Sequence, residues 1–157
     1  MIFSLTQARK GLAVLDSSWS GVSDKIALVA DFLLRLTLAK VFFSSGWVKV
    51  SDWGSTLFLF QEEYKVPLLP PELAAYLATV AELGLSVLLV LGLLTRLSAL
   101  GLFVLNGVAV LAYYDTLKDS PVALNDHWYW GLMLCIVLVL PLRQLSADYW
   151  LKRMSDN

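Results

Sequence analysis

Apolar residues gather in four long stretches of the chain, each bounded by short polar segments. Crossing the hydrocarbon core of a bilayer, about 30 Å thick, takes roughly 20 helical residues. The stretches at residues 26–48, 72–94, 96–114 and 127–142 come near that length, so the pattern predicts four membrane-spanning helices. Arg96 interrupts the second and third stretches, and LLTRLS around it is expected to form a tight helical hairpin turn.

Three further segments are predicted to lie along the membrane surface. In the loop after the first stretch, four apolar residues recur at helical spacing: Trp53, Leu57, Phe60 and Tyr64. This spacing predicts an amphipathic helix that lies on the outer surface. Residues 1–25 are too weakly apolar for a signal-peptide core and are expected to form a retained interfacial segment. Residues 143–157 form a basic tail suited to an anionic inner leaflet.

The composition supports a membrane protein. Of the 157 residues, 58% are hydrophobic and 16% are charged, against about 45–50% and roughly 25% in an ordinary soluble domain. The mean hydropathy is +0.68. A net charge of −1 gives no indication of a nucleic-acid partner. We therefore expect an all-α integral membrane four-helix bundle, a single domain over residues 1–157 with the lipid bilayer as its main partner.

The distribution of basic residues predicts the orientation of the bundle. Three basic residues fall on one side of the predicted spans: Lys49, Lys65 and Lys118. Seven fall on the other side: Arg9, Lys10, Lys25, Arg96, Arg143, Lys152 and Arg153. The positive-inside rule then places both termini in the cytoplasm. The expected location is a bacterial cytoplasmic (inner) membrane, crossed several times.

Charged residues inside the predicted spans need partners, because an unpaired charge at the bilayer centre costs about 2.5–3.5 kcal/mol on insertion scales. At 1.5 Å per residue, Lys40 lies roughly 12 Å and Glu82 about 15 Å below the outer surface. Their similar depth predicts an ion pair between Lys40 and Glu82. Asp31 and Arg35 stand one helical turn apart and can pair within the first span.

Structural and functional interpretations of these polar residues compete. Asp31 and Asn106 are as readily explained as polar contacts that hold a small bundle together. Glu82 is a functional candidate by default, because it is an intramembrane carboxylate. Lys49 and Arg96 lie near the interfaces, where long side chains reach the headgroups at little cost.

Several short motifs on the first two spans resemble the DoxX family of small four-helix membrane proteins. These motifs are, in order, Arg35, Phe43, Gly46-x-x-Lys49, Ala81-Glu82-Leu83 and Leu91-Gly92-Leu93-Leu94-Thr95-Arg96. The similarity covers roughly residues 28–145. The stretches VPLLPPELAAY and DHWYWGLML also resemble a branch of the family encoded beside metal-binding modified peptides in bacteria.

The resemblance implies an association with membrane oxidoreductases, since the related DoxD type is a subunit of a thiosulfate to quinone oxidoreductase. Much of the family has no settled activity. Arg35, Gly46, Lys49, Glu82 and Arg96 match the recurring polar or small residues of the family. Lys40 departs from the small or apolar residue expected at its position, so a family-wide role for it is in doubt.

The inventory of redox-active and metal-binding side chains narrows the chemistry. Cys135 is the sole cysteine, which excludes a dithiol relay within one chain and favours inert packing. His127 is the sole histidine, which excludes bis-His haem ligation within one chain. No metal site can be identified from one chain. His127 is either a proton donor or ligand at the outer mouth of the fourth span, or a simple interfacial histidine.

A quinone site needs no metal ligand, only an apolar slot with aromatic walls, one or two hydrogen-bond donors and a proton source. Lys49 and His127 could be the donors and Glu82 the proton carrier, so Glu82 and His127 are the candidate catalytic residues. Arg35 and Lys40 are further candidates for ligand contacts. The candidate walls are Phe42, Phe43, Trp47, Tyr113, Trp128 and Trp130. Such aromatic residues equally form a belt at the membrane interface.

Three functions are therefore compatible with the sequence. The first is a membrane redox subunit that exchanges electrons or protons with quinone as part of a quinone-linked oxidoreductase. The second is a non-catalytic scaffold that docks redox-complex subunits or other partners. The third, ranked lowest, is a small carrier for a lipid or metabolite, since four helices are few for alternating access without homo-oligomerisation.

Overall fold

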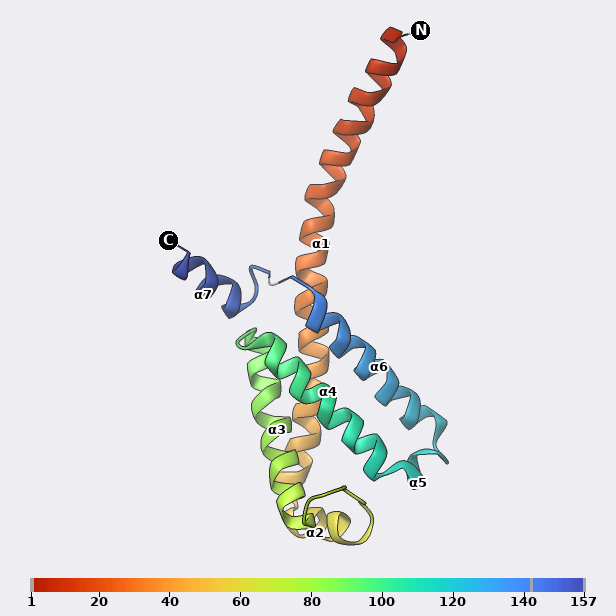
Figure 1. Cartoon of the computed structure of the whole chain (residues 1–157), viewed down its shortest axis with the longest axis vertical. Helices are drawn as coiled ribbons and strands as arrows, with labels where there is room; N and C mark the ends of the chain where they lie inside the picture. The colour runs from red at the N-terminus through yellow and green to blue at the C-terminus, as the bar shows by residue number, and fades with distance from the viewer. Residues whose placement is uncertain (1, 142, 157) are drawn as a thin grey trace.

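The computed structural model describes residues 2–141 and 143–156, with side chains from residue 21 onward, and these residues form helices and connecting turns without a strand. The helices are α1 (Ile2–Ser51), α2 (Trp53–Glu62), α3 (Pro71–Leu91), α4 (Thr95–Ala112), α5 (Tyr114–Leu117), α6 (Pro121–Val139) and α7 (Ala147–Ser155). Figure 1 shows α3, α4 and α6 gathered around the second half of α1. The predicted all-α class is confirmed.

Among the described residues, three helices are long and apolar enough to cross a membrane: α3, α4 and α6. Of their apolar windows, 33%, 33% and 11% of the residues are buried inside the protein. Most of their side chains therefore face outward, as expected where lipid replaces water. Predicted span 26–48 lies within α1, and it differs from α3, α4 and α6 in carrying three charged residues: Asp31, Arg35 and Lys40.

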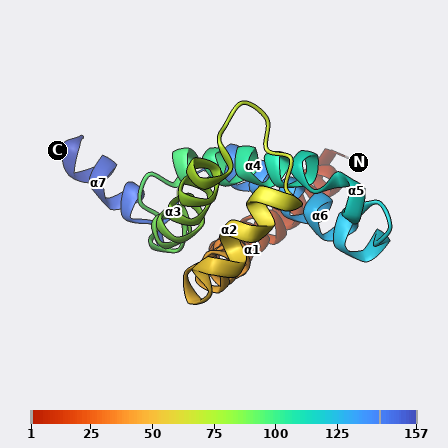
Figure 2. The ribbon, with the colours of Figure 1, turned by 90° about the horizontal axis from the view of Figure 1, so that it is seen from below.

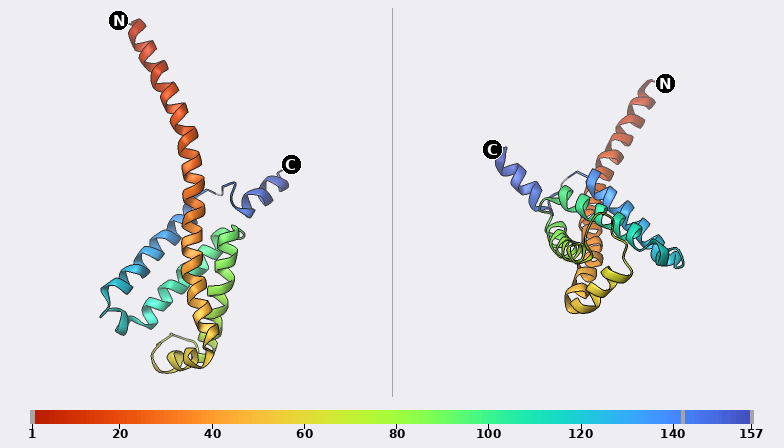
Figure 3. Two further views of the ribbon diagram at one scale, coloured as in Figure 1. Left: turned by 180° about the vertical axis from the view of Figure 1, so that it is seen from behind. Right: turned by 60° about the horizontal axis from the view of Figure 1, so that its bottom comes forward.

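Helix α1 continues without a break through residue 25, where the sequence predicted the end of a separate interfacial segment. Its first half projects beyond the other helices (Figure 3). Helix α6 begins at Pro121, six residues before the predicted start of the last span, and ends at Val139, before the predicted end. Pro121 suits the first helical turn, where its missing N–H leaves no hydrogen bond unmade.

The turn between α3 and α4 lies just before the predicted position. Helix α3 ends at Leu91, and Arg96 is already in the first turn of α4. Gly92 has φ +67°, and a Cβ at this position would lie 2.6 Å from the Cα of Ser146. Both the left-handed backbone and the close contact therefore require glycine. Leu94 is also left-handed, with φ 50°.

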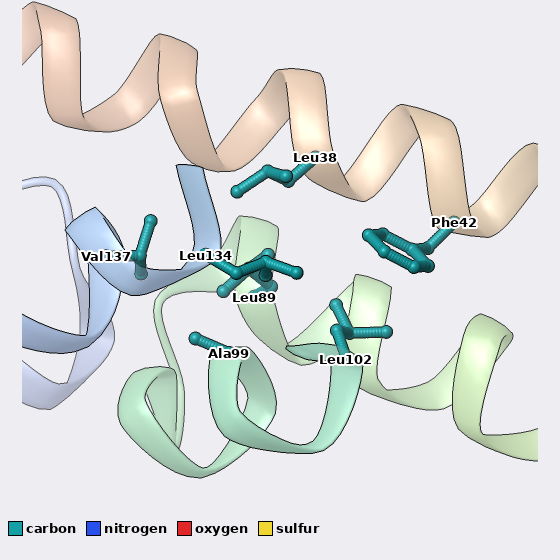
Figure 4. Packing of buried hydrophobic residues seen from close by; sticks show 7 residues of the cluster. All are labelled: Leu38, Phe42, Leu89, Ala99, Leu102, Leu134 and Val137. Atoms are coloured by element: carbon teal, nitrogen blue, oxygen red, sulfur yellow. The ribbon is translucent and has the colours of Figure 1, made fainter. Parts of the chain in front are cut away.

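The core lies between α1, α3, α4 and α6. Leu38 and Phe42 of α1 point toward Leu89 of α3 and Leu102 of α4 (Figure 4). Ala99, Leu134 and Val137 complete this buried cluster. Burying a leucine-sized side chain contributes about 1.5–3 kcal/mol in water. Within a membrane, close packing between the helices takes over that role.

Helix α2 confirms the helix that the sequence predicted after the first span, and its apolar stripe packs against the start of α3. Phe60 is buried against Ala74 and Ala75 at the start of α3. Trp53, Leu57 and Tyr64 pack against the same cluster. Figure 2 shows α2 crossing the end of α1. The stripe thus covers the first turns of α3, an arrangement that periodicity alone cannot distinguish from membrane contact.

Candidate functional site

Glu82 lies in the middle of α3 and faces α1. Both of its carboxylate oxygens accept hydrogen bonds from the Nζ of Lys49, each at 2.8 Å. The Oγ of Ser45 donates to the same carboxylate at 3.1 Å. The side chains of Lys49 and Glu82 are 16% and 10% exposed. This arrangement, called here the Lys49–Glu82 pair, is a nearly buried ion pair that joins α1 to α3.

The predicted pairing of Lys40 with Glu82 is wrong. Lys40 is exposed on the outward face of α1. Nine residues separate it from Lys49, a rotation of about 180° around a helix with 3.6 residues per turn. Depth along the helix therefore suggested Lys40, but the direction of the side chain excluded it.

Gly46 allows α1 and α3 to approach closely enough for the Lys49–Glu82 pair to form. A Cβ at this position would lie 2.9 Å from the Cγ of Leu83 and 3.0 Å from the Cβ of Glu82. Small residues commonly let membrane helices come together in this way. The need for glycine at the first position of the Gly46-x-x-Lys49 motif is therefore explained by steric contact with α3.

A shallow apolar groove lies on the outer surface of α1 and α3, and Leu83, the residue that follows Glu82, is part of its lining. The rings of Phe43 and Trp47 stack with their centroids 6.4 Å apart. The other lining residues are Leu83, Gly84, Val87 and Leu88. A Cβ added at Gly84 would meet nothing within 4 Å, so the groove has room at this point. Leu83 lines the groove and also contacts Gly46, directly beside Glu82.

Arg35 lies at the other end of the α1–α3 contact and is completely buried. Its Nε and Nη2 donate to Asp31 at 3.2 and 3.1 Å, which confirms the predicted pair. Its remaining hydrogen bonds go to the backbone carbonyls of Leu89, Val90 and Leu145 at 3.3, 3.4 and 2.8 Å. The first two carbonyls belong to the end of α3, where a helix lacks its own donors. This geometry, the Arg35 cluster, supports a structural role.

The C-terminal segment is anchored beside the Arg35 cluster through the α3–α4 turn. The Oγ of Ser146 and the backbone N–H of Asp148 both donate to the carbonyl of Gly92, at 2.8 and 2.9 Å. The carboxylate of Asp148 accepts from the N–H groups of Leu94 and Thr95 at 2.8 and 2.7 Å. Partial burial opposes ionisation, but these hydrogen bonds outweigh it and lower the pKa of Asp148.

No sequence motif singles out Asp148. A side chain from outside α4 satisfies the free N–H groups at the start of that helix, the role that an N-cap residue usually has. No sequence spacing links residues so far apart.

His127 and Asn106 form a second polar contact, between α6 and α4. The Nδ1 of His127 lies 2.8 Å from the Oδ1 of Asn106, and the Asn106 Nδ2 donates to the His127 carbonyl at 2.9 Å. Trp130 contacts the rings of His127 and Phe42, with centroids 4.9 and 6.2 Å apart. No hydrogen bond or ion pair in the part of the chain described joins His127 to Glu82.

The six candidate wall residues do not form one slot. Phe43 and Trp47 line the groove, while Phe42 and Trp130 belong to the α1–α6 contact. The remaining two lie elsewhere: Tyr113 contacts Tyr64, and Trp128 is 66% exposed.

Two observations concern metals and thiols. Cys135, for which the sequence favours inert packing in the fourth span, is exposed on the surface of α6. Over residues 2–141 and 143–156, no group of three or more His, Cys, Asp or Glu side chains is arranged to hold a metal ion.

Comparison with known proteins identifies the family of this chain. A family model described as DoxX matches residues 30–115, which include α2, α3 and α4 and the part of α1 with the Lys49–Glu82 pair. An uncharacterized protein of Haemophilus influenzae is 30% identical over 148 residues, covering 88% of this chain and 92% of the relative. No solved structure shows a significant match. The chain belongs to the DoxX family of membrane proteins.

Proposed function

We propose that this protein is a membrane subunit of a redox system, that it holds a quinone-type ligand against the Phe43–Trp47 groove, and that Glu82 exchanges protons with that ligand. The observation that carries the proposal is the position of a nearly buried ion pair directly beside an apolar, aromatic-lined groove. Intramembrane carboxylates commonly mark ion, proton or substrate pathways.

The two parts of the site supply different properties that a quinone needs. The groove offers an apolar surface and two stacked rings to a flat, hydrophobic head group. Lys49 is a hydrogen-bond donor, and Glu82 can take up or release a proton. Reducing a quinone to a quinol takes two electrons and two protons. A redox partner subunit would supply the electrons, and this chain would provide binding and one proton path.

The proposal includes α1 as the fourth membrane span. Asp31 pairs with Arg35, and Lys49 pairs with Glu82, so four charges that would oppose insertion are neutralised within the bundle. Four spans place both termini on one side, and the basic residues indicate the cytoplasmic side of a bacterial inner membrane.

The test is to measure quinone that copurifies with the protein in its native lipids, for the natural chain and for Gly84→Leu. The leucine side chain would occupy the groove without a clash at its Cβ, so bound quinone should fall several-fold. Gly107→Leu is the matched control, because its Cβ also meets nothing within 4 Å but it lies on α4. Equal quinone content in Gly84→Leu and Gly107→Leu would contradict the groove as the binding site.

A scaffold function is the second candidate, and one observation favours it. Thr37, Lys40 and Ser44 form an exposed polar stripe on the outward face of α1. Lys40 has no ion-pair partner among the residues described, so a neighbouring subunit with an acidic side chain could bind there. If the natural protein carries no quinone and shows no spectral response to added quinol, this second function is favoured.

A further inference from the structure

Helix α7 has two chemically distinct faces. At 100° per residue, Ala147, Trp150, Leu151 and Met154 lie within about 100° of one another. Trp150, Leu151 and Met154 are 49%, 51% and 66% exposed. The helix therefore presents an apolar face that the described part of the protein leaves uncovered.

A face of α7 that flanks the apolar face is attached to the bundle, which fixes the direction of the apolar face. Asp148 binds the first N–H groups of α4, and its own N–H binds the carbonyl of Gly92. These contacts orient the helix as it projects from the α3–α4 turn (Figure 1). The same end of the bundle contains the end of α3 at Leu91, the start of α4 at Thr95 and the end of α6 at Val139. Helix α7 thus lies level with the edge of three candidate spans.

A groove lies between α7 and the first turn of α4, and three cationic side chains are among the residues that line it. Arg96 comes from α4, and Lys152 and Arg153 come from α7. Two acidic residues also line the groove, but Asp148 is already bound to backbone N–H groups and Asp156 ends the helix. The guanidinium of Arg153 lies 5.9 Å from the ring centre of Trp150. Positive charge therefore sits directly beside the apolar face.

We propose that α7 lies in the headgroup layer of an anionic leaflet and that the groove between α7 and α4 binds the phosphate of an anionic phospholipid. The apolar face supplies contacts for acyl chains, while Arg96, Lys152 and Arg153 attract negative headgroups. A soluble anion would use only the cations and leave the apolar face in water. Because the apolar face and the cationic groove lie side by side, a lipid surface is the ligand that uses both.

The test uses the full chain with Cys135→Ser and Met154→Cys, labelled at position 154 with an environment-sensitive fluorophore. The protein is reconstituted in nanodiscs of phosphatidylcholine with increasing fractions of phosphatidylglycerol. Fluorescence should shift to the blue as phosphatidylglycerol increases, and high salt should reverse the shift because it screens exposed charges. Arg96→Gln, Lys152→Gln and Arg153→Gln should each weaken the response, by about five-fold per charge.

Lys118→Gln is the matched control, since Lys118 is an exposed cation directly after α5, away from α7, and is bound to Asp115. It should leave the response unchanged. Asp148→Asn should weaken the response although every cation remains, because it releases α7 from α4. An equal shift in pure phosphatidylcholine, or the same shift caused there by inorganic phosphate, would overturn the proposal. So would a full response in Asp148→Asn or an equal loss in Lys118→Gln.

Discussion

The Arg35 cluster and the Lys49–Glu82 pair both join α1 to α3, yet they use charge differently. Arg35 is fully buried and donates to one carboxylate and three backbone carbonyls from two distant segments. Lys49 donates to one carboxylate and one hydroxyl, and it remains 16% exposed beside an apolar groove. The first arrangement ties α1 to the end of α3 and to Leu145 with no exposed side-chain surface, whereas the second leaves both charged side chains slightly exposed.

The largest expected effect is the loss of Arg35. Arg35→Met leaves Asp31 buried without a partner and removes the donors to the end of α3 and to Leu145, so the loss should be about 3–5 kcal/mol. Arg35→Lys should recover little, because a single ammonium cannot reach all these acceptors. Thermal unfolding in detergent measures both variants. If Arg35→Met melts near the temperature of the natural protein, the Arg35 cluster does not stabilise the α1–α3 contact more than the Lys49–Glu82 pair does.

Glu82→Gln should have a smaller effect, up to about 3 kcal/mol, because the partly exposed Lys49 can move toward water or headgroups. Combining it with Lys49→Met should restore most of the stability, since no unpaired charge then remains. The combination with Lys40→Met is the control and should restore none. If both double variants melt alike, the assignment of Lys49 as the partner of Glu82 fails.

Gly46→Ala tests the close approach that forms the Lys49–Glu82 pair. Its methyl group would press on Leu83, and overpacking of this kind costs about 1–3 kcal/mol. Gly84→Ala on the facing helix is the matched control, because its methyl group enters open space. It should be neutral or slightly stabilising, since alanine favours a helix over glycine. Equal melting temperatures for the two variants would argue against a tight contact at Gly46.

Asp148→Asn should have the smallest effect, about 0.5–2 kcal/mol, the range for losing a helix cap. Because folding lowers the pKa of Asp148, the ionised carboxylate stabilises the fold above its unfolded pKa of about 3.9. That contribution is lost as the pH falls through the lower, folded value. The difference between natural protein and variant should therefore be constant near neutral pH and shrink in acid. A difference that grows in acid would contradict this assignment.

Local patterns in the sequence determined a large part of this structure. The hydrophobic stretches predicted α3, α4 and α6, because membrane insertion depends mainly on the length and polarity of a continuous segment. The Asp31–Arg35 pair was equally accessible, since residues four apart on a helix are always neighbours. The helical spacing of Trp53, Leu57 and Phe60 predicted α2 for the same reason.

Tertiary structure alone decided which surfaces and charges meet. Glu82 pairs with Lys49 rather than Lys40 because α1 is rotated so that Gly46 faces α3, and neither depth nor charge specifies that rotation. The stripe on α2 covers α3 because the chain folds back after residue 62. Asp148 reaches α4 because the end of α3, the start of α4 and the end of α6 lie at one edge of the bundle. These contacts join residues far apart in the chain, and their geometry depends on the packing of whole helices.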